Sequence, residues 1–238
     1  MRRIGHKGAD HIAPGNTLES FDAALAAGVD MIEFDVLPEN RDGSGRLILA
    51  HDYVDAASRP VVTLEDGLAH FRTDAYEKVD LDVDLKLPGY EEGVVAALRE
   101  YELVGRAMIS TMEDASLHKL REIAPEIPLG WSIPKVRRNY LGNPWTRLPA
   151  LALARYAQVV APRRVARRIR AGEIDAVMAH WALVTPRLVE AVRAAGGQVF
   201  VWTVDDPARI VALERLGVSG VISNDPRLFG PVPEPAGP

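Results

Sequence analysis

Residues 18–36, LESFDAALAAGVDMIEFDV, decide the expected fold because they join a helical segment to a strand. Leu18–Ala27 is amphipathic, and Gly28 follows it at the position where glycine commonly ends a helix. Met31–Val36 then reads as a short β-strand. Helix-like and strand-like segments alternate in this way along the chain, which favours a parallel sheet built from βα units.

Nine short β-type segments carry this pattern, with amphipathic segments such as Pro186–Ala195 between most of them. They are Arg3–His6, Met31–Val36, Arg46–His51, Leu81–Lys86, Ala107–Ser110, Leu129–Ile133, Ala176–His180, Val199–Val204 and Gly217–Ser223. Only Leu37–Gly45 separates the second segment from the third, whereas a parallel crossover needs roughly a dozen or more residues. We therefore expect Arg46–His51 to fold back as a hairpin arm. The other eight strands then form a single (β/α)₈ TIM barrel, a fold whose usual length is ~250 residues.

The composition of the 238-residue chain is that of a folded domain without disulfides. Hydrophobic residues make up 47% and charged residues 26%, which allows a large core. The absence of cysteine excludes disulfide scaffolds, thiolate zinc sites and cysteine nucleophiles. The net charge of −5 gives no case for nucleic-acid binding. The first ten residues lack the apolar region of a signal peptide, and no apolar run approaches the ~20 residues that span a bilayer. A cytoplasmic location is the resulting expectation.

We expect one barrel domain over residues 1–229 and a flexible, proline-rich tail over residues 230–238. Within the barrel, residues 132–172 are predicted to form a long basic helical insertion between the fifth and sixth barrel strands. This segment contains ten Lys or Arg residues and no Asp or Glu. Because the whole chain carries −5 and the insertion +10, the rest carries −15.

Two interpretations of the basic insertion remain open. Apolar residues interleave with its arginines, as in a helix that lies weakly on an anionic membrane surface. These residues are Trp145, Leu148, Leu151, Leu153 and Val159–Val160. The favoured alternative is a helical hairpin that packs on the barrel, with its arginines paired to acidic groups elsewhere in the chain.

Polar residues stand at the C-terminal ends of the predicted strands, where the active sites of TIM barrels lie. In chain order they are His6, Glu33, Asp35, Asp84, Lys86, Ser110, His180, Trp202 and Asn224. Glu33 and Asp35 share one face of their strand, as do Asp82, Asp84 and Lys86 of the next. Carboxylates so close repel one another unless a cation lies between them. Oxygen ligands without cysteine suit a hard ion, so we predict one divalent cation, Mg²⁺ or Ca²⁺.

Two histidines are expected beside this cation. Folding the chain about Asp42 and Gly43 brings His51 nearly opposite Asp35, and His6 ends the first strand, which neighbours the second. Imidazoles near neutral pH can serve as general base and general acid. Each histidine alone would more often be structural, but the coincidence of both at one site favours catalysis. Which one is the base stays open.

A phosphate-binding surface is also expected at this end of the barrel. Asn16 reads as the N-cap of the first helix, with Glu19 reaching back to it, so that the helix N-terminus faces the barrel mouth and favours an anion. Trp202 is expected to form a wall for the apolar side of the substrate. Four side chains are therefore expected to contact the substrate: Lys7, Lys86, His180 and Trp202.

Six motifs between residue 4 and about residue 226 resemble the glycerophosphodiester phosphodiesterase family. They are His6-Lys7-Gly8, Asn16-Thr17, GVDMIEFDV at 28–36, His51-Asp52, Asp84-Leu85-Lys86 and Val201-Trp202-Thr203. The resemblance implies a TIM barrel, one bound divalent cation and hydrolysis of small-molecule glycerophosphodiesters to glycerol 3-phosphate and an alcohol. It also implies Glu33, Asp35 and Asp84 as metal ligands, with His6 and His51 as the acid–base pair.

Three residues depart from the family's pattern. Lys7 stands where Arg is usual and lacks the bidentate fork that matches phosphate. Gly15 replaces the usual Glu before Asn-Thr, and Asp84 replaces a longer Glu, so the cation must lie closer to that strand. Two alternatives follow. One is a lysophospholipase D-like or sphingomyelinase D-like lipid phosphodiesterase. The other is an inactive barrel that binds a phosphorylated ligand, which only Lys7 and Gly15 favour.

Overall fold

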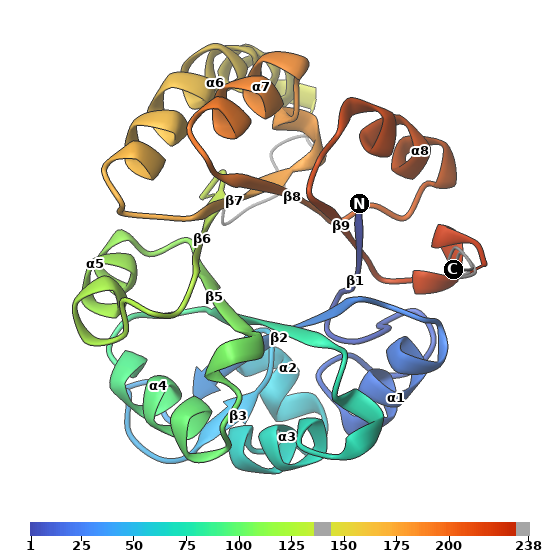
Figure 1. Cartoon of the computed structure of the whole chain (residues 1–238), viewed down its shortest axis with the longest axis vertical. Helices are drawn as coiled ribbons and strands as arrows, with labels where there is room; N and C mark the ends of the chain where they lie inside the picture. Colours follow the sequence, from blue (N-terminus) through green and yellow to red (C-terminus); the bar gives the residue numbers. More distant parts are fainter. Residues whose placement is uncertain (136–143, 232–238) are drawn as a thin grey trace, which may run out of the picture.

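The computed structural model of the chain describes residues 1–135 and 144–231 and shows a closed barrel (Figure 1). Its parallel strands are β1 (Arg2–Gly5), β2 (Met31–Pro38), β4 (Asp80–Leu85), β5 (Ala107–Thr111), β6 (Leu129–Ile133), β7 (Ala176–His180), β8 (Gln198–Trp202) and β9 (Gly220–Ser223). Each strand pairs with the next in this order, and β1 pairs with both β9 and β2, which closes the ring. The predicted (β/α)₈ TIM barrel is confirmed.

Helices surround the barrel on its outside (Figure 1). They are α1 (Leu18–Ala26), α2 (Tyr53–Ser58), α3 (Leu64–Phe71), α4 (Glu91–Glu100), α5 (Asp114–Ile123), α6 (Pro144–Arg170), α7 (Pro186–Ala194) and α8 (Pro207–Leu216). Short 3-10 helices are η1 (Asp74–Tyr76), η2 (Val104–Arg106), η3 (Trp181–Leu183) and η4 (Pro226–Phe229). In the described parts of the chain, no helix combines the length and apolar character needed to cross a bilayer.

The third β segment is the hairpin arm that the short connection predicted. β3 (Leu47–Leu49) runs antiparallel to β2, with Leu49 opposite Val36 and Leu47 opposite Pro38. The strand ends at Leu49, so His51 lies in the loop before α2. If this register is continued beyond Leu49, Ala50 lies opposite Asp35, and His51 is the next residue along the chain.

In its described residues, 132–135 and 144–172, the basic insertion contains one long helix. α6 continues without a break for 27 residues, so the favoured expectation of a helical hairpin is wrong. The hairpin interpretation also expected arginines of the insertion to pair with acidic groups elsewhere, and Arg168 does so. It forms ion pairs with Asp114 at 2.6 Å and with Glu173 at 2.9 Å. The last seven residues of the expected tail, 232–238, lie outside the described residues. The bounds of the barrel domain and of its tail stay predictions.

The barrel interior has an apolar layer below a polar one. The apolar layer consists of Ile4, Met31, Met108, Ala176, Met178, Phe200 and Ile222. Because alternate residues of a strand face the same side, the residues two positions further on point into the same interior, nearer the C-terminal ends. Two residues beyond six of the seven apolar residues stand His6, Glu33, Ser110, His180, Trp202 and Asn224. The sequence therefore closes the lower barrel with hydrophobic side chains and presents polar groups at its mouth.

Candidate active site

Three carboxylates converge at the mouth of the barrel. Glu33 and Asp35 come from β2, and Asp84 from β4 lies opposite Asp35 in the strand register. One oxygen from each of the three lies within 4.8 Å of the others. Glu33 and Asp35 are buried and Asp84 is partly exposed, so the cluster is accessible from one side. These residues can hold a metal ion with three oxygen ligands.

The electrostatics of this cluster suit a cation. Burial, reinforced by the charge of Asp35, raises the pKa of Glu33 well above its usual value. Burial likewise raises the pKa of Asp84, against the opposing charge of Lys86. Burial alone would raise the pKa of Asp35 too, but the charges of Lys86 and the two histidines lower it below its usual range. A divalent ion would favour the ionised form of all three carboxylates.

Lys86 lies within the carboxylate cluster. Its Nζ contacts Oδ1 of Asp35 and Oδ2 of Asp84. Burial alone would lower the pKa of Lys86. The negative charges of Asp35 and Asp84 outweigh the effect of burial and hold this pKa well above its usual value. Lys86 was expected to bind phosphate, yet in this structure its ammonium contacts two of the candidate metal ligands. A cation bound by these carboxylates would therefore share their oxygens with Lys86.

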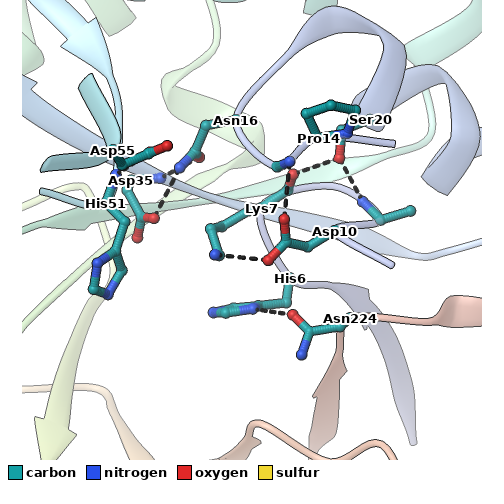
Figure 2. A network of polar contacts seen from close by, with 12 residues as sticks. His6, Lys7, Asp10, Pro14, Asn16, Ser20, Asp35, His51, Asp55 and Asn224 are labelled. Atoms are coloured by element: carbon teal, nitrogen blue, oxygen red, sulfur yellow. Dashed lines mark hydrogen bonds and ion pairs between the residues drawn. The ribbon is translucent and has the colours of Figure 1, made fainter. Parts of the chain in front are cut away.

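Asn16 holds Asp35 rather than capping a helix, so its predicted role as N-cap is wrong. Thr17 is the N-cap of α1, and its side chain accepts a hydrogen bond from the backbone N–H of Ser20. Glu19 is then the second helical residue and not the third, which a capping box requires. Asn16 is buried, has a left-handed φ of 59°, and donates from Nδ2 to Oδ2 of Asp35 at 2.9 Å. Figure 2 shows this contact beside His51.

His6 points its Nε2 at the carboxylates. Its Nδ1 lies 2.6 Å from Oδ1 of Asn224, and its Nε2 lies 3.9 Å from Oε2 of Glu33. Nδ2 of Asn224 donates to Oδ2 of Asp205 at 2.7 Å, which leaves Oδ1 as the acceptor for His6. The Nδ1 of His6 therefore carries the proton, and Nε2 is unprotonated. Burial lowers the pKa of His6 to about 4, so the ring is neutral near pH 7.

His51 is more exposed than His6. Just over half of its side-chain surface is accessible (53%), and its Nδ1 lies 3.1 Å from a carboxylate oxygen of Asp52. Its backbone N–H donates to Oδ2 of Asp55 at 3.0 Å, which fixes the start of the loop. Figure 2 shows the ring beside Asp35, with His6 on the opposite side, next to Asn224. The structure thus places both predicted histidines around the carboxylates.

The β1–α1 loop shapes the position of Lys7. Lys7 has a φ of 50°, and its backbone N–H donates to Oε2 of Glu33 at 2.8 Å. Its ammonium forms an ion pair with Asp10 at 2.7 Å. Gly8 follows with a φ of 86°, and a Cβ there would lie 2.4 Å from Oγ of Ser20. The loop is therefore tightly packed, and its turn requires glycine at position 8.

Asp10 also explains the glycine at position 15. The backbone N–H of Gly15 donates to Oδ1 of Asp10 at 2.9 Å, and a Cβ at position 15 would lie 2.5 Å from that oxygen. A glutamate at position 15 would collide with Asp10. The ion pair with Asp10 opposes the effect of burial and raises the pKa of Lys7. Lys7, Asp10 and Gly15 thus form one packed unit.

His180 and Trp202 meet at the ends of β7 and β8. Their ring centroids are 5.2 Å apart, and Nε1 of Trp202 donates to the carbonyl of Met178 at 2.8 Å. Trp181 packs against His180 at 5.1 Å, and the guanidinium of Arg209 lies 3.8 Å from the centre of the Trp181 ring. Burial, together with the charge of Arg209, lowers the pKa of His180. The structure brings this predicted pair together at the mouth, while its contact with substrate stays a prediction.

Sequence reasoning gave no role to three polar residues of the site: Asp10, Asp205 and Asn224. Asn224 was recognised as a strand end, but its partners, His6 and Asp205, are 218 and 19 residues away along the chain. Only closure of the barrel between β1 and β9 brings His6 and Asn224 together. No local motif carries that signal.

A closed (β/α)₈ barrel with convergent carboxylates and two histidines at its mouth defines the class of this protein: a TIM-barrel hydrolase with a candidate metal centre. The chain matches the model of the glycerophosphoryl diester phosphodiesterase family over residues 6–57 and 37–228, and it belongs to that family. It is therefore an enzyme that hydrolyses phosphodiesters. The family resemblance of the motifs is confirmed.

Relatives match nearly the whole chain. A glycerophosphodiester phosphodiesterase of Caldanaerobacter subterraneus is 24% identical, over 94% of this chain and 93% of the relative. The crystal structure of a glycerophosphodiester phosphodiesterase from Agrobacterium tumefaciens superposes with a TM-score of 0.69 at 23% identity, covering 96% of this chain and 99% of that one. An Oleispira antarctica phosphodiesterase in complex with the product sn-glycerol-3-phosphate has a TM-score of 0.66 at 19% identity, covering 95% and 94%. These structures share the fold.

Proposed function

We propose that this enzyme hydrolyses glycerophosphodiesters to glycerol 3-phosphate and an alcohol, using one divalent cation, Mg²⁺ or Ca²⁺. The observation that carries the proposal is the convergence of Glu33, Asp35 and Asp84 within 4.8 Å at the mouth of a barrel of this family. The three residues supply only oxygen ligands, which suits a hard cation. The product named for the Oleispira antarctica structure supports the substrate class.

His6 and His51 have different roles in the proposed proton transfers. When bound, the cation would polarise the phosphoryl oxygens and lower the pKa of the nucleophilic oxygen. His6 accepts the proton from the nucleophile, because Asn224 holds its Nδ1–H and leaves Nε2 free as a base. His51 protonates the leaving alcohol, since its ring is exposed and is oriented by Asp52. Each proton transfer contributes roughly 10²–10⁴-fold to the rate.

The remaining site residues bind the substrate. Lys7 supplies positive charge for the phosphate from the β1–α1 loop, and Lys86 supplies a second charge from the end of β4. His180 and Trp202, whose ring planes meet at 78°, form an aromatic corner at the mouth that would contact the carbon skeleton of the glycerol or of the alcohol.

The test is hydrolysis of glycerophosphocholine and glycerophosphoethanolamine with Mg²⁺ or Ca²⁺, with and without a chelator. We expect release of choline or ethanolamine that the chelator stops. His6→Ala and His51→Ala should each retain less than a tenth of the activity, while His118→Ala, an exposed histidine of α5, should match the wild type. Lysophosphatidylcholine serves as a third substrate, because its preferred cleavage would favour the lipid phosphodiesterase alternative. If no alcohol is released from any of these substrates, the alternative of an inactive barrel that binds a phosphorylated ligand is favoured.

A further inference from the structure

The outer surface of α6 carries two kinds of exposed side chain in one stripe. Tyr156, Val159 and Val160 lie three and four residues apart, so they share a face of the helix. Tyr156 is 65% exposed and Val159 is 61% exposed. The same face continues with Arg163 and Arg167. On the opposite face Ala161, Val165 and Ala166 are buried, which shows that this stripe points outward.

The arginines of the stripe border a groove. The groove has a volume of about 450 Å³ and lies between α6 and the first turn of α7, which stand side by side in Figure 1. It is lined by Val159, Val160, Arg163, Arg164, Arg167 and Arg187. Arg164 also lies 4.8 Å from the centre of the Trp131 ring. Among the residues that the structure describes, Arg163, Arg167 and Arg187 form no ion pair.

The apolar part of the stripe lies at the level of the barrel mouth. Nε2 of Gln158 donates to the carbonyl of Ala182 at 2.8 Å. Ala182 belongs to η3, which directly follows the C-terminal end of β7. Tyr156, Val159 and Val160 are therefore level with the mouth, and Arg163 and Arg167 lie one and two turns further from it. A surface that lies along this outward face would contact the apolar side chains and the arginines together.

We propose that the α6–α7 face is a docking surface for an anionic phospholipid membrane. Arginines unpaired with carboxylates attract anionic head groups, and an adjacent apolar cluster inserts into the boundary between head groups and acyl chains. A soluble polyanion would use the charges but has no apolar layer for Tyr156 and Val159. The proposal rests on the outer surface alone and does not depend on the proposed hydrolysis.

Charge segregation supports a defined orientation. The insertion carries +10 within a chain whose net charge is −5, so the remaining surface is repelled by the same anionic lipids. Binding should therefore require this face. Because exposed charges are screened by salt, the attraction should weaken strongly between low and high ionic strength.

The experiment is co-sedimentation with vesicles of phosphatidylcholine alone or with an equal share of phosphatidylglycerol, at 50 and 500 mM NaCl. We expect binding only to the anionic vesicles, and at least tenfold more of it at low salt. Arg163→Glu/Arg167→Glu should weaken this binding about 30-fold or more. Lys78→Glu/Arg215→Glu, the same charge change at two exposed residues elsewhere, should weaken it less than threefold.

A second pair of variants tests the apolar layer. Tyr156→Ser/Val159→Ser should weaken binding to anionic vesicles about fivefold and leave binding to soluble polyphosphate unchanged. The lipid proposal is overturned if anionic vesicles are not bound at 50 mM NaCl. It is also overturned if the two serine substitutions have no effect while polyphosphate binds as tightly as vesicles do. Circular dichroism and thermal unfolding of each variant confirm that a loss of binding is not a loss of fold.

Discussion

Asn16 and Asp35 hold each other through two hydrogen bonds. Nδ2 of Asn16 donates to Oδ2 of Asp35 at 2.9 Å, and the backbone N–H of Asp35 donates to Oδ1 of Asn16 at 3.0 Å. Both residues are fully buried. The amide thus fixes one carboxylate oxygen, while the other faces Lys86 and the proposed cation. We therefore expect Asn16 to position Asp35 within the candidate metal site, although it contributes no ligand atom itself.

Replacing Asn16 should weaken cation binding. In Asn16→Gly the left-handed φ of 59° is retained without strain but the amide is lost, so we expect the affinity for Mg²⁺ or Ca²⁺ to fall about tenfold. Asn16→Ala should lose the same affinity and also roughly 1–2 kcal/mol of stability relative to Asn16→Gly, because a Cβ disfavours this φ. Calorimetric titration and urea unfolding measure the two effects separately. Wild-type affinity in Asn16→Gly would contradict the positioning role.

More of the fold than of the candidate site could be predicted from the sequence. Strand spacing identified the closed barrel and the hairpin arm, because both follow from short-range periodicity and connection length. The hydrogen bonds of Asn16 could not be predicted: its neighbours fit a helix cap, and its partner Asp35 is 19 residues away. The single long helix was also missed, since Pro162 lies inside α6, where proline normally ends a helix. The motifs identified the family, but the mutual contacts of their residues depend on barrel closure.

Asp10 should determine which residues position 15 tolerates. A Cβ at position 15 would lie 2.5 Å from Oδ1 of Asp10, so Gly15→Ala should destabilise the protein by about 1–3 kcal/mol. In an Asp10→Gly background that oxygen is absent, and the same substitution should cost at least about 0.5 kcal/mol less. Urea unfolding of the two single variants and the double variant gives the coupling energy. Strictly additive costs would show that Asp10 is not the obstacle.

Lys86 should compete with the metal ion. Its ammonium contacts Asp35 and Asp84, two of the three candidate ligands. Removing this charge in Lys86→Gln should raise the affinity for a divalent cation about tenfold, because the carboxylates lose their nearest positive partner. Catalysis should nevertheless fall, since the phosphate loses a contact. Lys86→Arg keeps the charge and is the matched control, with no gain in affinity expected. Unchanged cation binding in Lys86→Gln, measured by calorimetry, would count against competition.

Asp205 should set the tautomer of His6. It accepts from Nδ2 of Asn224 at 2.7 Å, so the Oδ1 of Asn224 faces His6. We expect ¹⁵N NMR at pH 7 to show the proton of His6 on Nδ1 in the wild type. In Asp205→Ala the amide can rotate, and the Nε2-protonated form should become detectable, with a fall in activity of about tenfold. The His70 resonances should not change and provide an internal control. An unchanged His6 tautomer in Asp205→Ala would show that Asp205 does not determine it.

The buried state of His6 should make the protein less stable in mild acid. Its folded pKa of about 4 lies below the ordinary value of 6.5, because burial disfavours the charged ring. Below pH 6.5 the unfolded chain therefore binds a proton that the folded chain does not, and the free energy of unfolding falls until the pH reaches about 4. Since a fifth of the side chain is exposed, we expect a loss of about 2 kcal/mol over this interval. His6→Gln lacks this titration, so its stability should fall less steeply than that of the wild type over the same range. Urea unfolding in the presence of a chelator, repeated from pH 7 to 4, measures the difference, and parallel curves for the two proteins would show that His6 is not held in its neutral form by the fold.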